Sequence, residues 1–180
     1  PDGVAAVRLG EALGRPVVIT ARGTDINLLP KFPGPRAQII EAAHKAAGII
    51  TVSRALKESI VSLGIPADKI TVLRNGVDLE FFVPSTDRQK LRQELSMSRR
   101  TLLSVGNLIE LKGHHLIIEA MQSLPDTDLF VIGGGERQGM LVDQVNSMGL
   151  KDRVTLTGAM SQDRLRSYFQ AADALVLASS

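Results

Sequence analysis

The 180-residue chain contains no cysteine and no tryptophan, and aromatic residues make up only 3% of it. The missing cysteines exclude disulfides, thiolate zinc sites and cysteine nucleophiles. With so few aromatic rings, the core must be built from valine, isoleucine, leucine and alanine. Few ring platforms remain on which the bases of single-stranded nucleic acid could stack.

Charge and hydropathy exclude further classes of protein. The chain carries 21 basic and 19 acidic residues, a net charge of +2, which is too small an excess to predict nucleic acid as a partner. No apolar run reaches the length of about 18 residues that a membrane-spanning helix needs. Because cysteine is absent, as in many proteins of reducing compartments, we expect a cytoplasmic protein, associated at most peripherally with the inner face of the membrane.

Short β-branched runs alternate along the chain with segments of helical period. The runs are almost continuously apolar, as expected for strands buried on both faces of a parallel sheet. Their alternation with helices predicts an α/β fold of the doubly wound, Rossmann-like type. Glycines 14, 64 and 149 follow apolar helical segments, where they predict left-handed helix ends. The predicted strands are 16–20, 48–53, 69–74, 101–106, 128–133, 153–158 and 174–179.

The alternation of strands and helices is interrupted near residues 79–99, where a charged stretch contains Pro84. We predict that residues 1–83 close one domain, that 84–99 form a linker with a short helix over 87–96, and that 100–180 open a second domain. The first helix, 4–13, has no strand before it, and the last strand has no helix after it. We therefore expect a chain that is cut at both ends, with each domain represented only in part.

The strongest local pattern is TLLSVGNLIELKGHHLIIEAM, residues 101–121. A buried strand ends at Gly106, and Lys112 and Gly113 are predicted to open a helix. Helix N-termini carry unpaired N–H groups and about half a positive charge, which favours phosphate binding. Glycine also lets a ligand approach the backbone closely. The alternative is that the glycines only shape a loop and that Lys112 is a solvated surface residue.

A second glycine-rich turn follows the strand at 128–133. It consists of Gly133, Gly134, Gly135 and Glu136, and it lacks the third glycine of a dinucleotide-binding fingerprint because Gln138 stands there. A nucleotide could approach this turn at the carboxyl edge of the sheet. Equally, the glycines could form a plain turn, with Glu136 in the first turn of a helix, where its charge suits the helix dipole.

In the first domain, Arg22 and Asp25 follow a strand at the ligand-binding edge of an open α/β sheet. The proline-rich residues 30–35 are predicted to form an irregular loop that could close over an acceptor. The alternative is a turn that the Asp25 side chain stabilises.

For three further groups of residues, we favour ordinary structural roles over roles in ligand binding. Ser53 is predicted to cap a helix, and Asn75 and Gly76 are predicted to form a turn, with Asp78 near an interdomain cleft. The three histidines, at 44, 114 and 115, lack metal-ligand spacing and are assigned to surface or packing roles.

Six segments in order resemble the retaining GT-B glycosyltransferases of the group-1, family-4 type. The NGVDLEFF and VGNLIELKG segments resemble that family's N-G-[VI]-D-x-x-x-F and V-G-R-L-x-x-x-K-G patterns. The others are GIITVS, the glycine turn at 131–136, VTLTG at 154–158 and YFQAADALVLAS at 168–179. The resemblance covers nearly the whole chain, and it implies two Rossmann-like domains and transfer of a sugar from a nucleoside diphosphate sugar to a saccharide or lipid acceptor.

The resemblance also implies roles for residues. Gly106, Lys112 and the helix after Gly113 would hold the donor diphosphate, together with position 107 and the glycine turn 133–136. Thr157 and Gly158 would face the base. Arg22 and Asp25 would be the candidate catalytic residues on the acceptor side, and Ser53, Asn75, Gly76 and Asp78 would line the cleft. No metal or other cofactor is expected, because Lys112 and the helix would supply the positive charge.

The sequence departs from the family pattern at two positions, and a third feature is missing. The arginine expected after Gly106 is Asn107, and Arg22 stands where many members have histidine; Arg22 could offer the charge that Asn107 lacks. The paired glutamates expected after the last strand are absent, so we expect this chain to be inactive alone. A sugar-nucleotide epimerase and a non-catalytic nucleotide-binding module remain alternatives, which product analysis and donor turnover would separate from a transferase.

Overall fold

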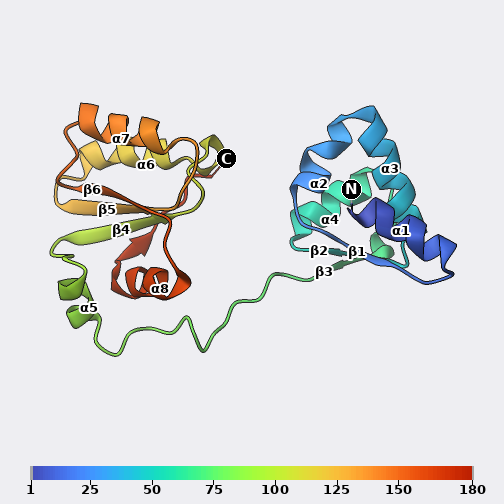
Figure 1. The fold of residues 1–180 in the computed structure, drawn as a ribbon, viewed down its shortest axis with the longest axis horizontal. Coiled ribbons are helices and arrows are strands. Elements are labelled where there is room, and N and C mark those ends of the chain that lie inside the picture. The colour runs from blue at the N-terminus through green and yellow to red at the C-terminus, as the bar shows by residue number, and fades with distance from the viewer. Residues whose placement is uncertain (1, 180) are drawn as a thin grey trace. The chain divides into compact units, whose positions relative to one another are not determined.

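The computed structural model describes residues 2–179 and divides the chain into two compact units between Val77 and Asp78. Each unit is a parallel sheet with helices packed against it (Figure 1). All seven strands expected from the sequence are present, each within a few residues of its expected bounds. The prediction of an α/β fold with two Rossmann-like parts is therefore confirmed.

The sheet of the first unit has the strand order β1-β2-β3. Ile19, Ile49 and Ile70 lie opposite one another across the three strands and belong to one apolar core. Burying an isoleucine side chain contributes about 1.5–3 kcal/mol, so this row is a main source of the unit's stability. The strands are β1 (Val18–Ala21), β2 (Gly48–Thr51) and β3 (Ile70–Val72), and the helices are α1 (Asp2–Ala12), α2 (Thr24–Asn27), η1 (Leu29–Lys31), α3 (Pro33–Lys45), α4 (Arg54–Ser62) and η2 (Ala67–Lys69).

The irregular loop expected at residues 30–35 is wrong. Pro30 lies in the first turn of η1, and Pro33 is the first residue of α3. Proline is well tolerated at a helix start, because its missing N–H would have no partner there. The expected helix ends are confirmed, since Gly14, Gly64 and Gly149 have φ angles of 62°, 93° and 66°.

The sheet of the second unit has the order β6-β5-β4-β7, with all strands parallel. Helices α6 and α7 cover one face, whereas α5 and α8 cover the other (Figure 1). Because the chain returns from β6 past β4 to β7, the strand order reverses beside β4, and ligands of open α/β sheets bind at such a reversal. The elements are α5 (Arg88–Glu94), β4 (Arg100–Val105), η3 (Glu110–Lys112), α6 (His114–Ala120), η4 (Met121–Ser123), β5 (Thr127–Ile132), α7 (Gln138–Ser147), β6 (Val154–Gly158), α8 (Gln162–Ala171) and β7 (Ala174–Leu175).

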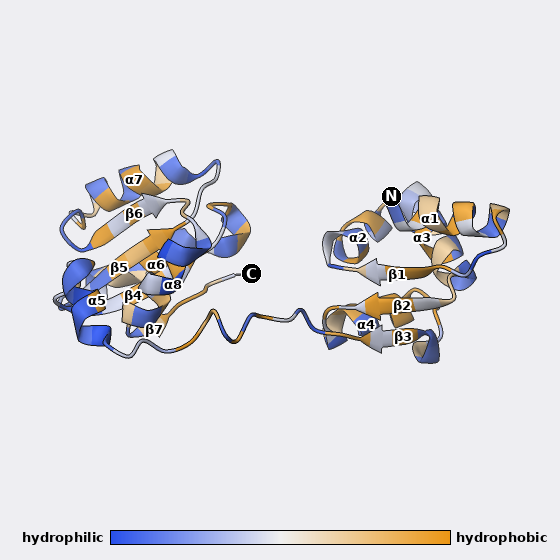
Figure 2. Ribbon diagram, turned by 60° about the horizontal axis from the view of Figure 1, so that its bottom comes forward, coloured by the Kyte–Doolittle hydropathy of each residue, from blue (hydrophilic) through white to orange (hydrophobic). Residues whose placement is uncertain are grey.

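Two apolar clusters fill the second unit, one on each face of the sheet. Leu129 and Val131 of β5 pack with α6 and α7, whereas Leu103 of β4 packs with Tyr168 of α8. Figure 2 shows β5 mainly in the hydrophobic colour and the exposed helix α5 mainly in the hydrophilic one. The only tyrosine of the chain is thus buried in the second unit, with its ring centroid 5.5 Å from that of Phe130.

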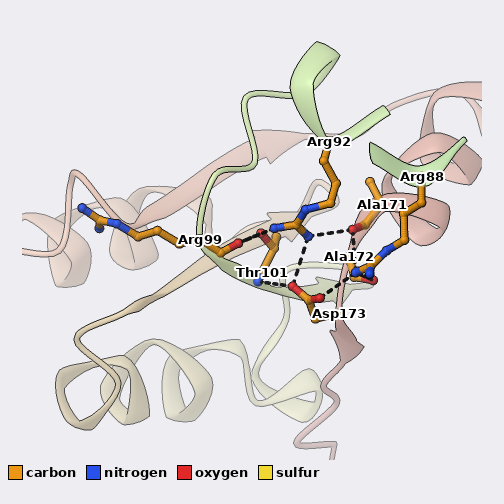
Figure 3. Close-up of polar contacts among 7 residues, drawn as sticks. All are labelled: Arg88, Arg92, Arg99, Thr101, Ala171, Ala172 and Asp173. Atoms are coloured by element: carbon orange, nitrogen blue, oxygen red, sulfur yellow. Dashed lines mark hydrogen bonds and ion pairs between the residues drawn. The ribbon is translucent and has the colours of Figure 1, made fainter. Parts of the chain in front are cut away.

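The residues expected to form a linker, 84–99, belong to the second unit. The expected helix is present as α5, and two of its arginines bind Asp173, which precedes β7 (Figure 3). Arg88 approaches one carboxylate oxygen at 2.6 Å and Arg92 the other at 3.1 Å. The amide of Thr101 in β4 also donates to Asp173 at 2.7 Å. We name this group of four residues the Asp173 clamp. Because it joins α5 to two strands, α5 belongs to the second unit, which begins at Asp78.

Candidate functional site

The turns that follow β4, β5 and β6 meet at the carboxyl edge of the second sheet. The amide of Gly106 donates to the last carbonyl of β5 at 3.0 Å, and the amide of Leu108 donates to Gly134 at 2.9 Å. The amide of Gly133 donates to the carbonyl of Gly158 at 3.0 Å. Main-chain bonds thus bring together the three glycine-containing segments that the sequence placed at one edge of a parallel sheet.

The glycines of the second turn have a packing function. Gly133 has a φ angle of 151°, and a Cβ atom there would overlap the carbonyl oxygen of Gly106. A Cβ atom on Gly135 would lie 2.6 Å from the carbonyl oxygen of Leu108. Two turns can therefore touch only because side chains are missing, and this contact accounts for both glycines without a ligand. Glu136 is exposed and lies two residues before α7, not in its first turn as expected.

In the connection from β4 to α6, the helix starts two residues later than the expectation that Lys112 opens it. Lys112 is the last residue of η3, Gly113 is left-handed with a φ angle of 63°, and α6 begins at His114. A Cβ atom on Gly113 would overlap the carbonyl oxygen of Ala178, which follows β7. Gly113 therefore fixes the loop against the strand on the other side of the order reversal.

Gly106 stands in more open surroundings than these glycines. The atoms nearest to a Cβ atom built there are His114 Nε2 and the Cγ and Cδ atoms of Lys112, each at 3.7 Å. Within residues 2–179, the Lys112 ammonium group forms no ion pair. The stem of a half-exposed lysine therefore lies beside a main-chain position without a side chain, within reach of an anion that docks there.

Two charged residues that sequence reasoning missed lie at the same edge. Glu110 of η3 forms an ion pair with Arg137, which follows the glycine turn, and Glu110 lies 3.6 Å from His115 Nε2. The amide of Arg137 also donates to the carbonyl of Leu108 at 3.0 Å. No helical or strand spacing links residues 110 and 137, so only the folded chain reveals this pair.

His114 is buried, with 1% of its surface exposed, as the expected packing role requires. Its Nδ1 atom lies 3.0 Å from the hydroxyl of Ser104, and its Nε2 atom is buried without a hydrogen-bond partner among the described residues. Burial lowers the pKa of His114, the backbone of Asn107 and Gly106 acts in the opposite direction, and the charge of Lys112 lowers this pKa further. The imidazole is therefore neutral at pH 7.

Three other residues that the sequence predicted for this edge, Asn107, Thr157 and Gly158, form few side-chain hydrogen bonds. The Asn107 side chain is exposed and forms no hydrogen bond among residues 2–179. The hydroxyl of Thr157 donates to the carbonyl of Gly158 at 3.0 Å, and Gly158 is left-handed with a φ angle of 73°. Thr157 and Gly158 therefore end β6 beside the glycine turn.

In the first unit, the structure shows the turn that was the alternative to a ligand site. The Asp25 carboxylate accepts hydrogen bonds from the amides of Gly23 at 2.7 Å and Arg22 at 3.2 Å. The Arg22 side chain is exposed. Asp25 also borders a mostly apolar cavity of about 90 Å³, lined among others by Ile19 and Ile40. The carboxylate thus shapes the segment between β1 and α2.

The residues expected to line the cleft lie on separate local features. Ser53 caps α4, since its hydroxyl accepts from the amide of Leu56 at 3.2 Å, and this prediction is confirmed. The turn expected at Asn75 and Gly76 is wrong, because both lie in a stretch without regular structure. The turn comes later, where the Asp78 carboxylate accepts two backbone amides at 2.9 Å. A carboxylate closes a turn by such bonds without any need for glycine.

Neither a metal-binding cluster nor a membrane-spanning helix is present among the described residues. No three His, Asp or Glu side chains within 2–179 gather in a way that could hold a metal ion. In the same range, every helix is too short or too polar to cross a bilayer.

Comparison with known proteins places these features in a family. Residues 86–180 match the family model described as "Glycosyl transferases group 1", and residues 1–81 match the one described as "Glycosyltransferase Family 4". The amylovoran biosynthesis glycosyltransferase AmsK of Erwinia amylovora is 32% identical over 135 residues, which cover 73% of this chain and 32% of AmsK. The D-inositol 3-phosphate glycosyltransferase of Xylanimonas cellulosilytica is 28% identical over 193 residues, covering 98% of this chain and 46% of that protein. The chain spans less than half the length of these curated relatives.

Solved structures share the fold. HepE of Anabaena, determined in complex with UDP, superposes with a TM-score of 0.87 at 24% identity, over 98% of this chain and 50% of HepE. Sucrose-phosphate synthase from Thermosynechococcus elongatus gives a TM-score of 0.82 at 20% identity, over 98% of this chain and 48% of that protein. Both likenesses agree with a GT-B fold. Since the group 1 model matches more than half of the residues, this chain belongs to the group 1 glycosyltransferases.

Proposed function

We propose that this protein transfers a sugar from a nucleoside diphosphate sugar to a hydroxyl group of an acceptor, with retention of anomeric configuration. The donor diphosphate docks over Gly106, against the ammonium group of Lys112. The observation that carries this proposal is the unpaired Lys112 beside a bare main-chain position, at the edge where the strand order reverses. Thr157 and Gly158, at the end of β6, face the nucleotide base.

The chemistry of transfer explains why a cation is useful there. The bond between the sugar C1 atom and the diphosphate oxygen breaks, a bond to the acceptor oxygen forms, and the acceptor hydroxyl loses its proton. Negative charge develops on the leaving diphosphate, and a fixed cation lowers the energy of that transition state. Because Lys112 and main-chain N–H groups can supply this charge, we propose that no divalent metal is needed.

Roles for the two units follow from this assignment. The second unit binds the donor, and the first unit faces the acceptor, with Arg22 offering an exposed cation and Asp25 holding the turn that carries it. The names of AmsK and of the D-inositol 3-phosphate glycosyltransferase support a saccharide or polyol hydroxyl as the acceptor. A lipid-linked acceptor would bring a cytoplasmic enzyme to the inner face of the membrane.

Calorimetric titration of the 180-residue chain with UDP-glucose, GDP-mannose and ADP-glucose tests the donor site. HepE has been determined with UDP and with UDP-glucose, which supports testing UDP-glucose first. Lys112→Ala should weaken binding by about 1.5–3 kcal/mol, the range of a hydrogen bond to a charged group. This corresponds to a factor of about 10–150 in Kd.

Lys151→Ala is the matched control for this titration. Lys151 is exposed in the turn that leads into β6, at the opposite edge of the same sheet. It should bind the donor like the unaltered chain. Equal affinity of the Lys112→Ala variant and this control would remove the basis of the assignment. Product analysis by NMR then separates transfer from epimerisation, and the anomeric coupling constant of the product tests retention.

A further inference from the structure

Two basic side chains flank the open main-chain position at Gly106. A Cβ atom there would lie 3.7 Å from His114 Nε2 on one side and 3.7 Å from the stem of Lys112 on the other. A ligand that docks over Gly106 therefore comes within a few ångströms of both groups. His114 does not reach the solvent, so it acts on such a ligand through its charge and not through direct contact.

The surroundings of His114 allow its charge to change without loss of its hydrogen bond. Ser104 is fully buried, and its hydroxyl lies 3.0 Å from Nδ1 of the imidazole. A hydroxyl group can donate to Nδ1 of a neutral ring and can accept from the N–H of a protonated ring. A carboxylate partner would instead hold the ring protonated. Ser104 thus positions His114 in both states and favours neither charge.

Burial is the main reason that His114 is neutral while the site is empty, because it lowers the pKa of the imidazole. The neighbouring basic residues Lys112 of η3 and His115 of α6 lower this pKa further, whereas the backbone of Asn107 and Gly106 raises it. The nearby carboxylate, Glu110, is engaged with Arg137 and His115. Among residues 2–179, no group forms a hydrogen bond with the buried Nε2 atom, and no anion there balances a proton on the ring.

We propose that His114 takes up a proton when a diphosphate docks over Gly106 and so becomes the second cation of the donor site beside Lys112. The inference rests on the proposed function. The diphosphate of a sugar nucleotide carries about two negative charges at neutral pH, of which Lys112 balances one. The proton comes from the solvent, and no covalent bond to the ligand forms.

The sign of the effect follows from linkage. A bound anion raises the pKa of His114, so protonation and donor binding strengthen each other equally. The gain in affinity is complete below the pKa of the empty site and is lost as the pH rises through the pKa of the occupied site. For a rise of about one pKa unit, Kd should be about tenfold lower at acid than at alkaline pH.

UDP-glucose is the right probe, because its diphosphate is esterified at both ends and does not itself titrate near neutral pH. Calorimetric titrations between about pH 5.5 and pH 8.5 should show tighter binding at the acid end, where His114 can be charged. In buffers of different ionisation enthalpy, binding should also show uptake of protons. His114→Asn should lose the pH dependence. His44→Asn, at an exposed histidine in α3 of the first unit, is the matched control and should keep it.

NMR titration of the unaltered chain gives a test that does not depend on any variant folding. The chain has only three histidines, so their ring signals are readily assigned. The pKa of His114 should rise by about one unit on saturation with UDP-glucose. No binding at any pH would contradict the proposed function itself. Binding that depends on Lys112 but leaves the pKa of His114 unchanged would overturn this inference alone.

Discussion

Replacement of Asp173 by asparagine should destabilise the second unit selectively. The carboxylate accepts hydrogen bonds from Arg88, Arg92 and the amide of Thr101. Asparagine keeps the shape but loses the negative charge, and its NH₂ group must face one of these donors. Hydrogen bonds to charged groups contribute about 1.5–3 kcal/mol each when buried. Because the side chain is 37% exposed, solvent screening reduces the expected loss to about 1–2 kcal/mol in total.

The loss of stability caused by Asp173→Asn should also depend on pH, and this dependence is a second, independent test. Burial raises the pKa of Asp173, but the hydrogen bonds from Arg88 and Thr101 and the charge of Arg92 outweigh it and hold the pKa below its usual range. A lowered pKa in the folded state means stability that is present above the unfolded-state value, about 3.9, and lost as the pH falls through the folded-state pKa. The difference between the two proteins should therefore be present at neutral pH and shrink in acid.

Tyrosine fluorescence during urea unfolding is the assay. The chain has one tyrosine and no tryptophan, and Tyr168 lies in α8, so the signal reports the second unit alone. Asp152→Asn, at an exposed carboxylate for which no hydrogen bond or ion pair is found within residues 2–179, controls for the change in net charge. If Asp173→Asn unfolds at the same urea concentration as this control at neutral pH, the Asp173 clamp does not stabilise the unit. A difference that persists undiminished at acid pH would show that charge is not its cause.

Two further predictions concern the carboxyl edge of the second sheet, where we propose that the donor binds. Gly133→Ala should lower the free energy of unfolding of the second unit by about 2 kcal/mol or more, because a Cβ atom overlaps a carbonyl oxygen. Gly139→Ala in α7, where a Cβ atom meets nothing within 4 Å, should be neutral or stabilising in the same tyrosine assay, and equal transitions for the two variants would refute the packing argument. Donor binding and any sugar transfer should be unchanged by EDTA, and restoration of lost activity by Mg²⁺ or Mn²⁺ would contradict a reaction without a metal.

The strands and most helix ends could be predicted from the sequence, because they depend on short-range patterns. The β-branched runs around Ile49 and Val131 leave little choice but buried strands, and glycine at 64 or 149 favours a left-handed helix end. The start of α3 at Pro33 was missed for a local reason, since a proline cluster is equally typical of loops and of helix starts.

Features that depend on contacts between distant segments could not be predicted. Glycine is required at position 133 because the carbonyl oxygen of Gly106, in another turn, leaves no room for a Cβ atom. The pairing of Glu110 with Arg137 and the burial of His114 also arise only when the three turns meet. The sequence did place Gly106 and Lys112 at one edge, because the carboxyl ends of parallel strands share that edge.

The segments that follow β4, β5 and β6 are joined through main-chain atoms, and this has a consequence for variation of the sequence. The amides and carbonyls of Gly106, Leu108 and Gly133 form the joints, whereas the side chains of Asn107 and Glu136 project from the same turns and are exposed. Replacing these two side chains changes the chemistry of the rim while the frame stays intact. A library randomised at both positions therefore tests, at little cost to folding, whether this rim sets the preference for the donor sugar that we propose to dock there.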